Sequence, residues 1–205
     1  MAEEKNLITE KDVKKSWLRY YFFAETGISY ERLQALGFCM ALIPILKKLY
    51  KKKEDFAAAL KRHMVFYNTE AVFGSVINGI TIAMEEQKAK GAPIEDETIT
   101  SVKSGLMGPM AGIGDSLDWA TLKPIIFALG ATLSAQGNPI GCFVLLLLPI
   151  IRIVIGTNLA ALGYRKGRSS VRSILGSGKI KQLLTAASAL GIYMMGALSS
   201  TYVSL

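Results

Sequence analysis

The sequence predicts an all-α fold: a polytopic membrane protein with broken or re-entrant helices and an N-terminal amphipathic helix. Residues 124–151 and 182–205 carry no charged side chain. Apolar runs of about 20 residues are long enough to cross a bilayer as helices, whereas water-soluble helices of that length normally keep a charged face. No stretch alternates between apolar and polar residues as a half-buried strand would.

The charge distribution favours a membrane over nucleic acid as the partner of this chain. The formal net charge is +8 over 205 residues. The basic residues cluster directly after apolar segments, at 47–53 and 165–172, which is the placement that the positive-inside rule gives to cytoplasmic loops. We therefore expect membrane lipid as a partner, no nucleic acid, and a cytoplasmic basic loop at residues 164–181.

The N-terminal segment, residues 1–28, contains a basic amphipathic helix. Thr9 and Asp12 have the spacing of a capping box at its start. Such a helix can lie in the membrane interface, or its stripe can pack on the rest of the protein, and the sequence leaves both open. No apolar h-region precedes it, so we expect insertion through internal segments. The stripe of apolar and aromatic residues at helical spacing is formed by Val13, Trp17, Tyr20 and Tyr21.

The remaining residues, 29–205, are expected to form one membrane domain. A short apolar segment at 33–46 is followed by an amphipathic helix at 54–64 and a longer apolar stretch at 64–84. Glu85 and Glu86 end that stretch, and solvated carboxylates at a membrane boundary are the expected arrangement. A further helix is expected to begin near residue 94.

A segment rich in glycine and proline lies between residues 101 and 124. Glycine and proline at this density weaken a continuous helix. A broken helix is tolerated at membrane depth only where protein or water surrounds it, and transporters build substrate sites from such breaks. Close packing of a second helix on a GxxxG pair is the alternative. The predicted break is formed by Gly108, Pro109, Gly112 and Gly114.

Polar residues inside apolar surroundings are the candidate substrate-binding groups. Amide, hydroxyl and carboxylate groups can donate to and accept from the hydroxyls of a sugar, and a carboxylate in an apolar frame is a functional candidate because its burial is costly. Polar contacts between helices are the alternative for these residues, and an ion pair is the simpler interpretation of Asp118 and Lys123. The candidates are Asn68, Thr69, Glu70, Asp115 and Ser116.

Catalytic residues, cofactors and metal ligands are not expected. His63 is the only histidine, and a lone histidine on a basic helix is most simply a surface or interface residue. Cys39 and Cys142 both lie in apolar contexts and are interpreted as buried hydrophobic residues rather than as a disulfide or metal pair.

Four blocks of this sequence resemble the IID component of the mannose/fructose/sorbose family of phosphotransferase permeases. The most specific block reads SVKSGLMGPMAGIGDSLDWATLKPI, at residues 101–125. The resemblance covers nearly the whole chain. The other three blocks are residues 29–50, 61–69 and 83–91.

This resemblance implies a multi-pass protein of the bacterial inner membrane that forms a sugar path with a IIC subunit. It implies soluble IIA and IIB partners that relay phosphate from HPr, with the IIB histidine phosphorylating the sugar on uptake. It also implies a higher oligomer of IIC–IID pairs, and a hexose or amino sugar as substrate. By the same resemblance, IID itself is not phosphorylated.

Several positions depart from the family pattern. Glu70 and Ala71 stand where the family commonly has His-Pro, and Asp118, Ala120 and Lys123 replace residues around the tryptophan. Family members also typically continue further at the C-terminus. The residue changes leave the identity of the substrate open, and the shorter C-terminus leaves an alternative open, namely a degenerate IID-like protein with a structural or receptor role and no transport. An acidic Glu70 would favour an amino sugar, because charge-assisted hydrogen bonds are stronger than neutral ones.

Overall fold

The computed structural model describes residues 7–175, and within that range the chain is helical without a regular strand, which confirms the all-α class. One described helix, at Ile140–Gly167, is long and apolar enough to cross a membrane. The helices are α1 (Glu10–Phe23), α2 (Ala35–Leu49), α3 (Lys53–His63), α4 (Ser75–Ala89), α5 (Asp96–Gly114), the π-helix η1 (Asp115–Leu122), α6 (Lys123–Ala135) and α7 (Ile140–Leu175).

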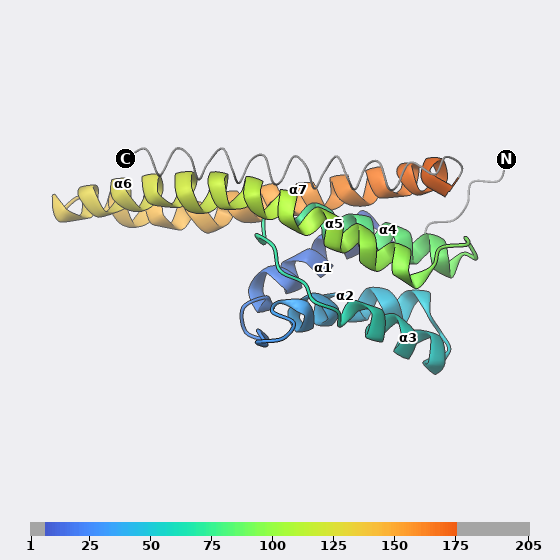
Figure 1. Ribbon diagram of the computed structural model, residues 1–205. Helices are drawn as coiled ribbons and strands as arrows, with labels where there is room; N and C mark the ends of the chain where they lie inside the picture. Colours follow the sequence, from blue (N-terminus) through green and yellow to red (C-terminus); the bar gives the residue numbers. More distant parts are fainter. Residues whose placement is uncertain (1–6, 176–205) are drawn as a thin grey trace, which may run out of the picture.

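A long helical hairpin organises the molecule (Figure 1). Helices α5, η1 and α6 follow one another without a gap and form one rod. The chain turns at Gly137, whose positive φ of 74° suits glycine, and α7 returns alongside α6. Helices α1 and α4 lie between α7 and the layer formed by α2 and α3, and the α6–α7 end projects beyond them.

The basic segment 164–181 was expected to be a loop, but the structure shows it as helix as far as residue 175. Helix α7 continues through it to Leu175, because Gly163 and Gly167 keep helical geometry and neither takes the positive φ of a helix C-cap. Residues 176–181 and the second charge-free run, 182–205, lie outside the described residues.

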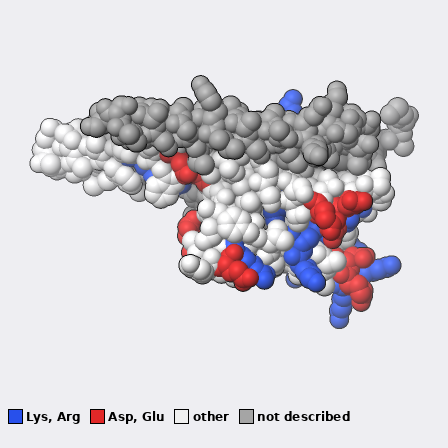
Figure 2. Space-filling view, viewed as in Figure 1, with Lys and Arg blue, Asp and Glu red and all other residues white. Residues whose placement is uncertain are grey.

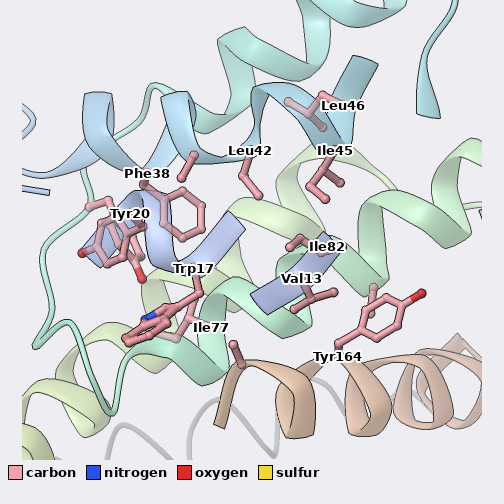
Figure 3. Packing of buried hydrophobic residues seen from close by; sticks show 14 of the residues in the cluster. Val13, Trp17, Tyr20, Phe38, Leu42, Ile45, Leu46, Ile77, Ile82 and Tyr164 are labelled. Carbon is pink, nitrogen blue, oxygen red and sulfur yellow. The ribbon is translucent and has the colours of Figure 1, made fainter. Parts of the chain in front are cut away.

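The N-terminal stripe packs on protein. Thr9 and Asp12 form the expected capping box, and Val13, Trp17 and Tyr20 are completely buried. Figure 3 shows these side chains between α2, α4 and α7. The Trp17 indole donates a hydrogen bond to the Ala71 carbonyl at 2.9 Å. These three residues of the stripe therefore belong to the hydrophobic core. The division of the chain at residue 28 remains a prediction.

Helices α4 and α7 approach each other through glycine. A Cβ atom on Gly79 would overlap the Ala160 carbonyl, and one on Gly163 would overlap the Val76 carbonyl. A Cβ atom on Gly156 would overlap the Trp17 ring. Small residues at these positions let the two backbones pack in direct contact. This contact fixes the base of the α6–α7 hairpin against the rest of the molecule.

Glu85 and Glu86 are buried, so the expectation of solvated carboxylates was wrong. Both are completely inaccessible to solvent. Glu86 accepts hydrogen bonds from the Leu7 amide at 2.8 Å and the Tyr164 hydroxyl at 2.6 Å. These partners lie 79 and 78 residues away in the chain, which is why local sequence context did not reveal them.

Glu85 is the centre of a buried charge cluster. It accepts hydrogen bonds from Arg62 Nε at 2.6 Å, from the Tyr50 hydroxyl at 2.6 Å, and lies 2.8 Å from His63 Nε2. Lys103 approaches the other ring nitrogen of His63 at 3.5 Å. Burial lowers the pKa of Lys103 to about 8. Burial alone would raise the pKa of Glu85, but the hydrogen bonds from His63 and Arg62 outweigh it and lower the pKa to about 2.

The first prediction is that Glu85→Gln destabilises the fold by about 3 kcal/mol at neutral pH, which is what lowering the pKa from 4.5 to about 2 is worth. A carboxylate with a depressed pKa stabilises the fold above its unfolded pKa. The difference between parent and variant should therefore shrink as the pH falls from about 4.5 towards 2. Thermal unfolding in detergent at several pH values measures this.

Glu31→Gln is the matched control, because the Glu31 side chain is 83% exposed and its one ion pair within residues 7–175 is with neighbouring Arg32. Exposed pairs of this kind contribute little. Equal unfolding temperatures for the parent and Glu85→Gln at pH 7 would contradict the prediction.

Candidate functional site

The candidate substrate residues lie on the segment that joins α3 to α4. The apolar stretch at 64–84 is helical only from Ser75, where α4 begins. The preceding residues form an irregular connection, with a turn at 71–74, that runs from α3 towards the α5–η1 rod (Figure 1). Thr69 holds this connection in place, since its amide donates to Gln34 Oε1 at 3.1 Å and its hydroxyl donates to the Met107 carbonyl at 3.2 Å.

A cavity of about 580 Å³ opens beside this connection. Four of the five residues predicted from the sequence line it, although they come from two segments about 45 residues apart: Asn68, Thr69, Glu70 and Asp115. Ser116 does not line it, because its hydroxyl donates to the Gly112 carbonyl within the same helix at 2.7 Å. The remaining walls are formed by Tyr21, Phe22, Ala24, Glu25, Gln34, Ala71, Ala111, Trp119, Lys123 and Arg152.

The Glu70 carboxylate is held by backbone amides two and three residues further along the chain. Its carboxylate accepts hydrogen bonds from the Val72 amide at 2.9 Å and from the Phe73 amide at 2.7 Å. It also lies 3.8 Å from Arg152 Nη2. A Cβ atom on Gly114 would lie 2.5 Å from Glu70 Oε2, so glycine is what lets the helix approach the carboxylate. Glu70 thus shapes the cavity wall, whereas Asn68 and Asp115 are solvent-exposed and available to a ligand.

The predicted break residues do not interrupt the helix. Gly108, Pro109, Gly112 and Gly114 all lie inside α5. The departure from α-helical geometry follows directly after them, as the π-helix η1. Proline removes one backbone donor and glycine weakens the helix, but widening the next turns absorbs the irregularity without ending the rod. Gly108 has no atom within 4 Å of its Cβ position among the described residues, so no described helix packs on it.

A second charge group lies beside the cavity, where two of its members, Lys123 and Arg152, line the wall; the sequence predicted its Asp118–Lys123 pair but not the part of Arg152. Asp118 is 1% exposed, and its Oδ2 lies 3.0 Å from Arg152 Nη2 and 3.5 Å from Lys123 Nζ. The attraction is ionic, since neither Asp118 oxygen is aligned for a hydrogen bond within the described part of the chain. Arg152 also lies 5.2 Å from the centre of the Tyr21 ring.

The sequence did contain a signal for Arg152. It is the only charged residue between Pro124 and Tyr164, and an ionisable residue inside an apolar span is a functional candidate by default. The ion pair expected between Asp118 and Lys123 is present. Sequence reasoning ended the charge-free run at residue 151 and so passed over the residue that ends it.

The described part of the chain contains neither a candidate metal centre nor an accessible histidine. Within residues 7–175 no group of three or more His, Cys, Asp or Glu side chains could hold a metal ion. His63 is completely buried, which corrects the expectation of a surface or interface residue. Burial lowers the pKa of His63, and the Glu85 hydrogen bond only partly opposes this effect.

The family model and the relatives described here agree on one protein family. The model of the PTS system mannose/fructose/sorbose family IID component matches residues 7–205. The sorbose-specific EIID component of Lacticaseibacillus casei is 41% identical over 203 residues, which cover 98% of this chain and 71% of that protein. The mannose-specific EIID component of Escherichia coli K12 is 39% identical, with 93% and 68% covered.

The fructose permease IID component of Bacillus subtilis 168 is 37% identical over 206 residues, which cover 100% of this chain and 74% of that protein. A chain of the mannose transporter ManYZ in complex with microcin E492 (MceA), solved by cryo-electron microscopy, matches this fold with a TM-score of 0.87 and 38% identity, covering 96% of this chain and 71% of that chain. The protein described here therefore belongs to the IID components of the mannose/fructose/sorbose family of PTS permeases.

Proposed function

We propose that this chain forms the sugar path of a phosphoenolpyruvate-dependent phosphotransferase permease together with a IIC subunit. In this proposal the IIB subunit phosphorylates the sugar on uptake, and IIA supplies the phosphate. The observation that carries the proposal is the cavity that brings Asn68, Thr69, Glu70 and Asp115 together beside an apolar hairpin. Its volume lies in the range of small-molecule sites, about 300–1,000 Å³.

The cavity contains the chemistry that a sugar requires. Sugar hydroxyls both donate and accept hydrogen bonds. The Asn68 carboxamide can do both, and the Asp115 carboxylate accepts. We assign direct contacts to these two residues, and supporting roles to Thr69, Glu70 and Ser116, whose polar groups are already engaged by protein.

The substrate class in this proposal is a hexose or an amino sugar. The Glu70 oxygens are occupied by backbone amides, so we place any attraction for an ammonium group on the exposed Asp115 instead. The relatives named for sorbose, mannose and fructose support a hexose site.

The membrane location proposed is the bacterial inner membrane, with more than one crossing. The most apolar 18-residue window of the α7 segment Ile140–Gly167 has a mean hydropathy of 2.4, and 17% of that window is buried in the protein. Figure 2 shows the projecting end of the hairpin almost free of charge, while charged side chains gather over the other end of the molecule. Lipid and a IIC subunit are the partners that this uncharged surface fits, within an oligomer of IIC–IID pairs.

Partner dependence follows from the same surface. The α6–α7 hairpin exposes large apolar side chains, among them Phe127, Phe143 and Leu146, and large exposed apolar areas mark membrane or protein contacts. We place residues 29–205 in the membrane domain of the complex, with residues 1–28 attached to it through the buried α1 stripe.

A receptor role without transport is the second candidate. The related mannose transporter ManYZ has been solved in complex with microcin E492, so a transporter of this fold can be bound by a peptide. The departures at Glu70, Ala71 and Asp118 from the family pattern motivate the same reading. Sugar uptake by cells that carry the assembled complex separates the two candidates, since a receptor alone gives none.

The second prediction concerns the two ligand-facing residues. We expect Asn68→Ala and Asp115→Asn each to raise the KM for the transported sugar by about tenfold or more, because the first removes a hydrogen bond to the ligand and the second removes the charge that strengthens one. Uptake of labelled sorbose, mannose and fructose is measured at equal amounts of assembled complex.

Asp55→Asn is the matched control, because Asp55 is exposed on α3 and lies outside this cavity. Normal affinity and transport in both Asn68→Ala and Asp115→Asn would leave these residues a structural role only and remove the proposed site.

The third prediction is that His63 carries no phosphate during turnover. Because His63 is buried between Glu85 and Lys103, a phosphodonor cannot reach it. Complexes with His63→Gln should phosphorylate sugar at close to the parental rate per assembled complex. A stable phosphohistidine at residue 63, formed with HPr and the soluble subunits, would contradict the assignment.

A further inference from the structure

One wall of the cavity is built from residues spaced four apart on a single rod. Ala111 lies in α5, Asp115 and Trp119 lie in η1, and Lys123 begins α6. All four line the same cavity. In a regular α-helix, residues spaced four apart would not all stay on the same face over this length.

An α-helix has 3.6 residues per turn, so a step of four residues overshoots a full turn by about 40°. Over three such steps, Ala111 and Lys123 would point in directions about 120° apart. A π-helix is wider and bonds residue i to residue i+5, so the same step falls short of a full turn and cancels the drift. The Thr121 hydroxyl, which donates to the Ser116 carbonyl five residues earlier at 2.8 Å, follows the π spacing.

The residue that gains most from this geometry is Trp119. It is 59% exposed, which is unusual for so large an apolar side chain with a core available. The Lys123 ammonium lies over one face of its indole, 2.8 Å from the ring centre, and is itself drawn towards Asp118 at 3.5 Å. The Lys123 ammonium thus covers one face of the ring, while more than half of the surface of Trp119 remains exposed at a position that lines the cavity.

A sugar presents two kinds of surface. Its hydroxyls require polar partners, while the C–H groups on one face of the ring require a flat apolar partner. The polar partners come from Asn68, on the connection between α3 and α4, and from Asp115, four residues before Trp119 on the same wall. We infer that Trp119 is the platform on which the sugar ring packs, and that the π-helix η1 is what turns it into the cavity. This inference rests on the proposed sugar site and adds a specificity-determining residue to it.

The test compares Trp119→Leu with Trp119→Phe in the complex assembled with the cognate IIC subunit. Both variants keep an apolar side chain, so contacts with lipid or a partner are preserved, but only phenylalanine keeps an aromatic face. Packing on an aromatic ring contributes enough to change affinity roughly 3- to 10-fold. We expect KM for sorbose or mannose to rise by that factor in Trp119→Leu and to stay within about twofold of the parent in Trp119→Phe.

Tryptophan fluorescence gives an independent readout. The chain has two tryptophans, and Trp17 is completely buried. Addition of the transported sugar should change the emission of the parent complex, and this change should be lost in Trp119→Phe.

Equal KM values in the parent and Trp119→Leu would overturn the inference, and so would loss of assembly in both variants, which would assign Trp119 to a subunit contact. If Asn68→Ala and Asp115→Asn lose affinity while Trp119→Leu does not, the proposed function stands and the platform fails. If the parent complex binds neither sorbose, mannose nor fructose, the proposed function fails together with it.

Discussion

The contact between the backbones of α4 and α7 is the constraint on which the rest of the molecule depends. Gly79 and Gly163 each face a carbonyl of the opposite helix with no room for a side chain. Because the two helices meet this closely, the position of α7 along α4 is fixed. That position sets where Arg152 enters the cavity and where Tyr164 meets Glu86. Dispersion and close packing, rather than hydrophobic transfer, drive such contacts in an apolar environment.

The α4–α7 contact also determines where the buried charged side chains lie. Burying an unpaired charge is costly. The buried charges of this protein are compensated in two places, and in different ways. Around Glu85 the charges are tightly hydrogen-bonded, with Arg62, His63 and Tyr50 all in reach. Around Asp118 the attraction is ionic and the hydrogen bonds are imperfect, and Arg152 Nε is without a hydrogen-bond partner among the described residues. The first cluster is built around a completely buried carboxylate inside the fold, whereas Lys123 and Arg152 of the second line the cavity.

The sequence predicted those features that arise from local chemistry. The capping box of Thr9 and Asp12 needs only residues three apart, and it was confirmed. The family was identified from one dense motif. Burial of Glu85 and Glu86 depends on partners 22 to 79 residues away, and no local pattern carries that information. The Gly-Pro segment was predicted to break the helix, but its residues lie inside α5 and the helix only widens after them, as η1; glycine density does not distinguish a broken helix from one that widens.

The rod formed by α5, η1 and α6 comprises 19, 8 and 13 residues. At 1.5 Å per residue, an α-helix of this length measures about 60 Å, twice the hydrocarbon thickness of a bilayer. Its π-helical stretch lies at the cavity, between the end buried on α4 and the end that projects with α7. A change in the geometry of η1, beside the cavity, would therefore change the direction of α6 relative to α5. A tilt of about 10° at η1 would move the tip of α6 by about 3 Å, so a ligand that reshapes one turn is mechanically connected to the far end of the hairpin.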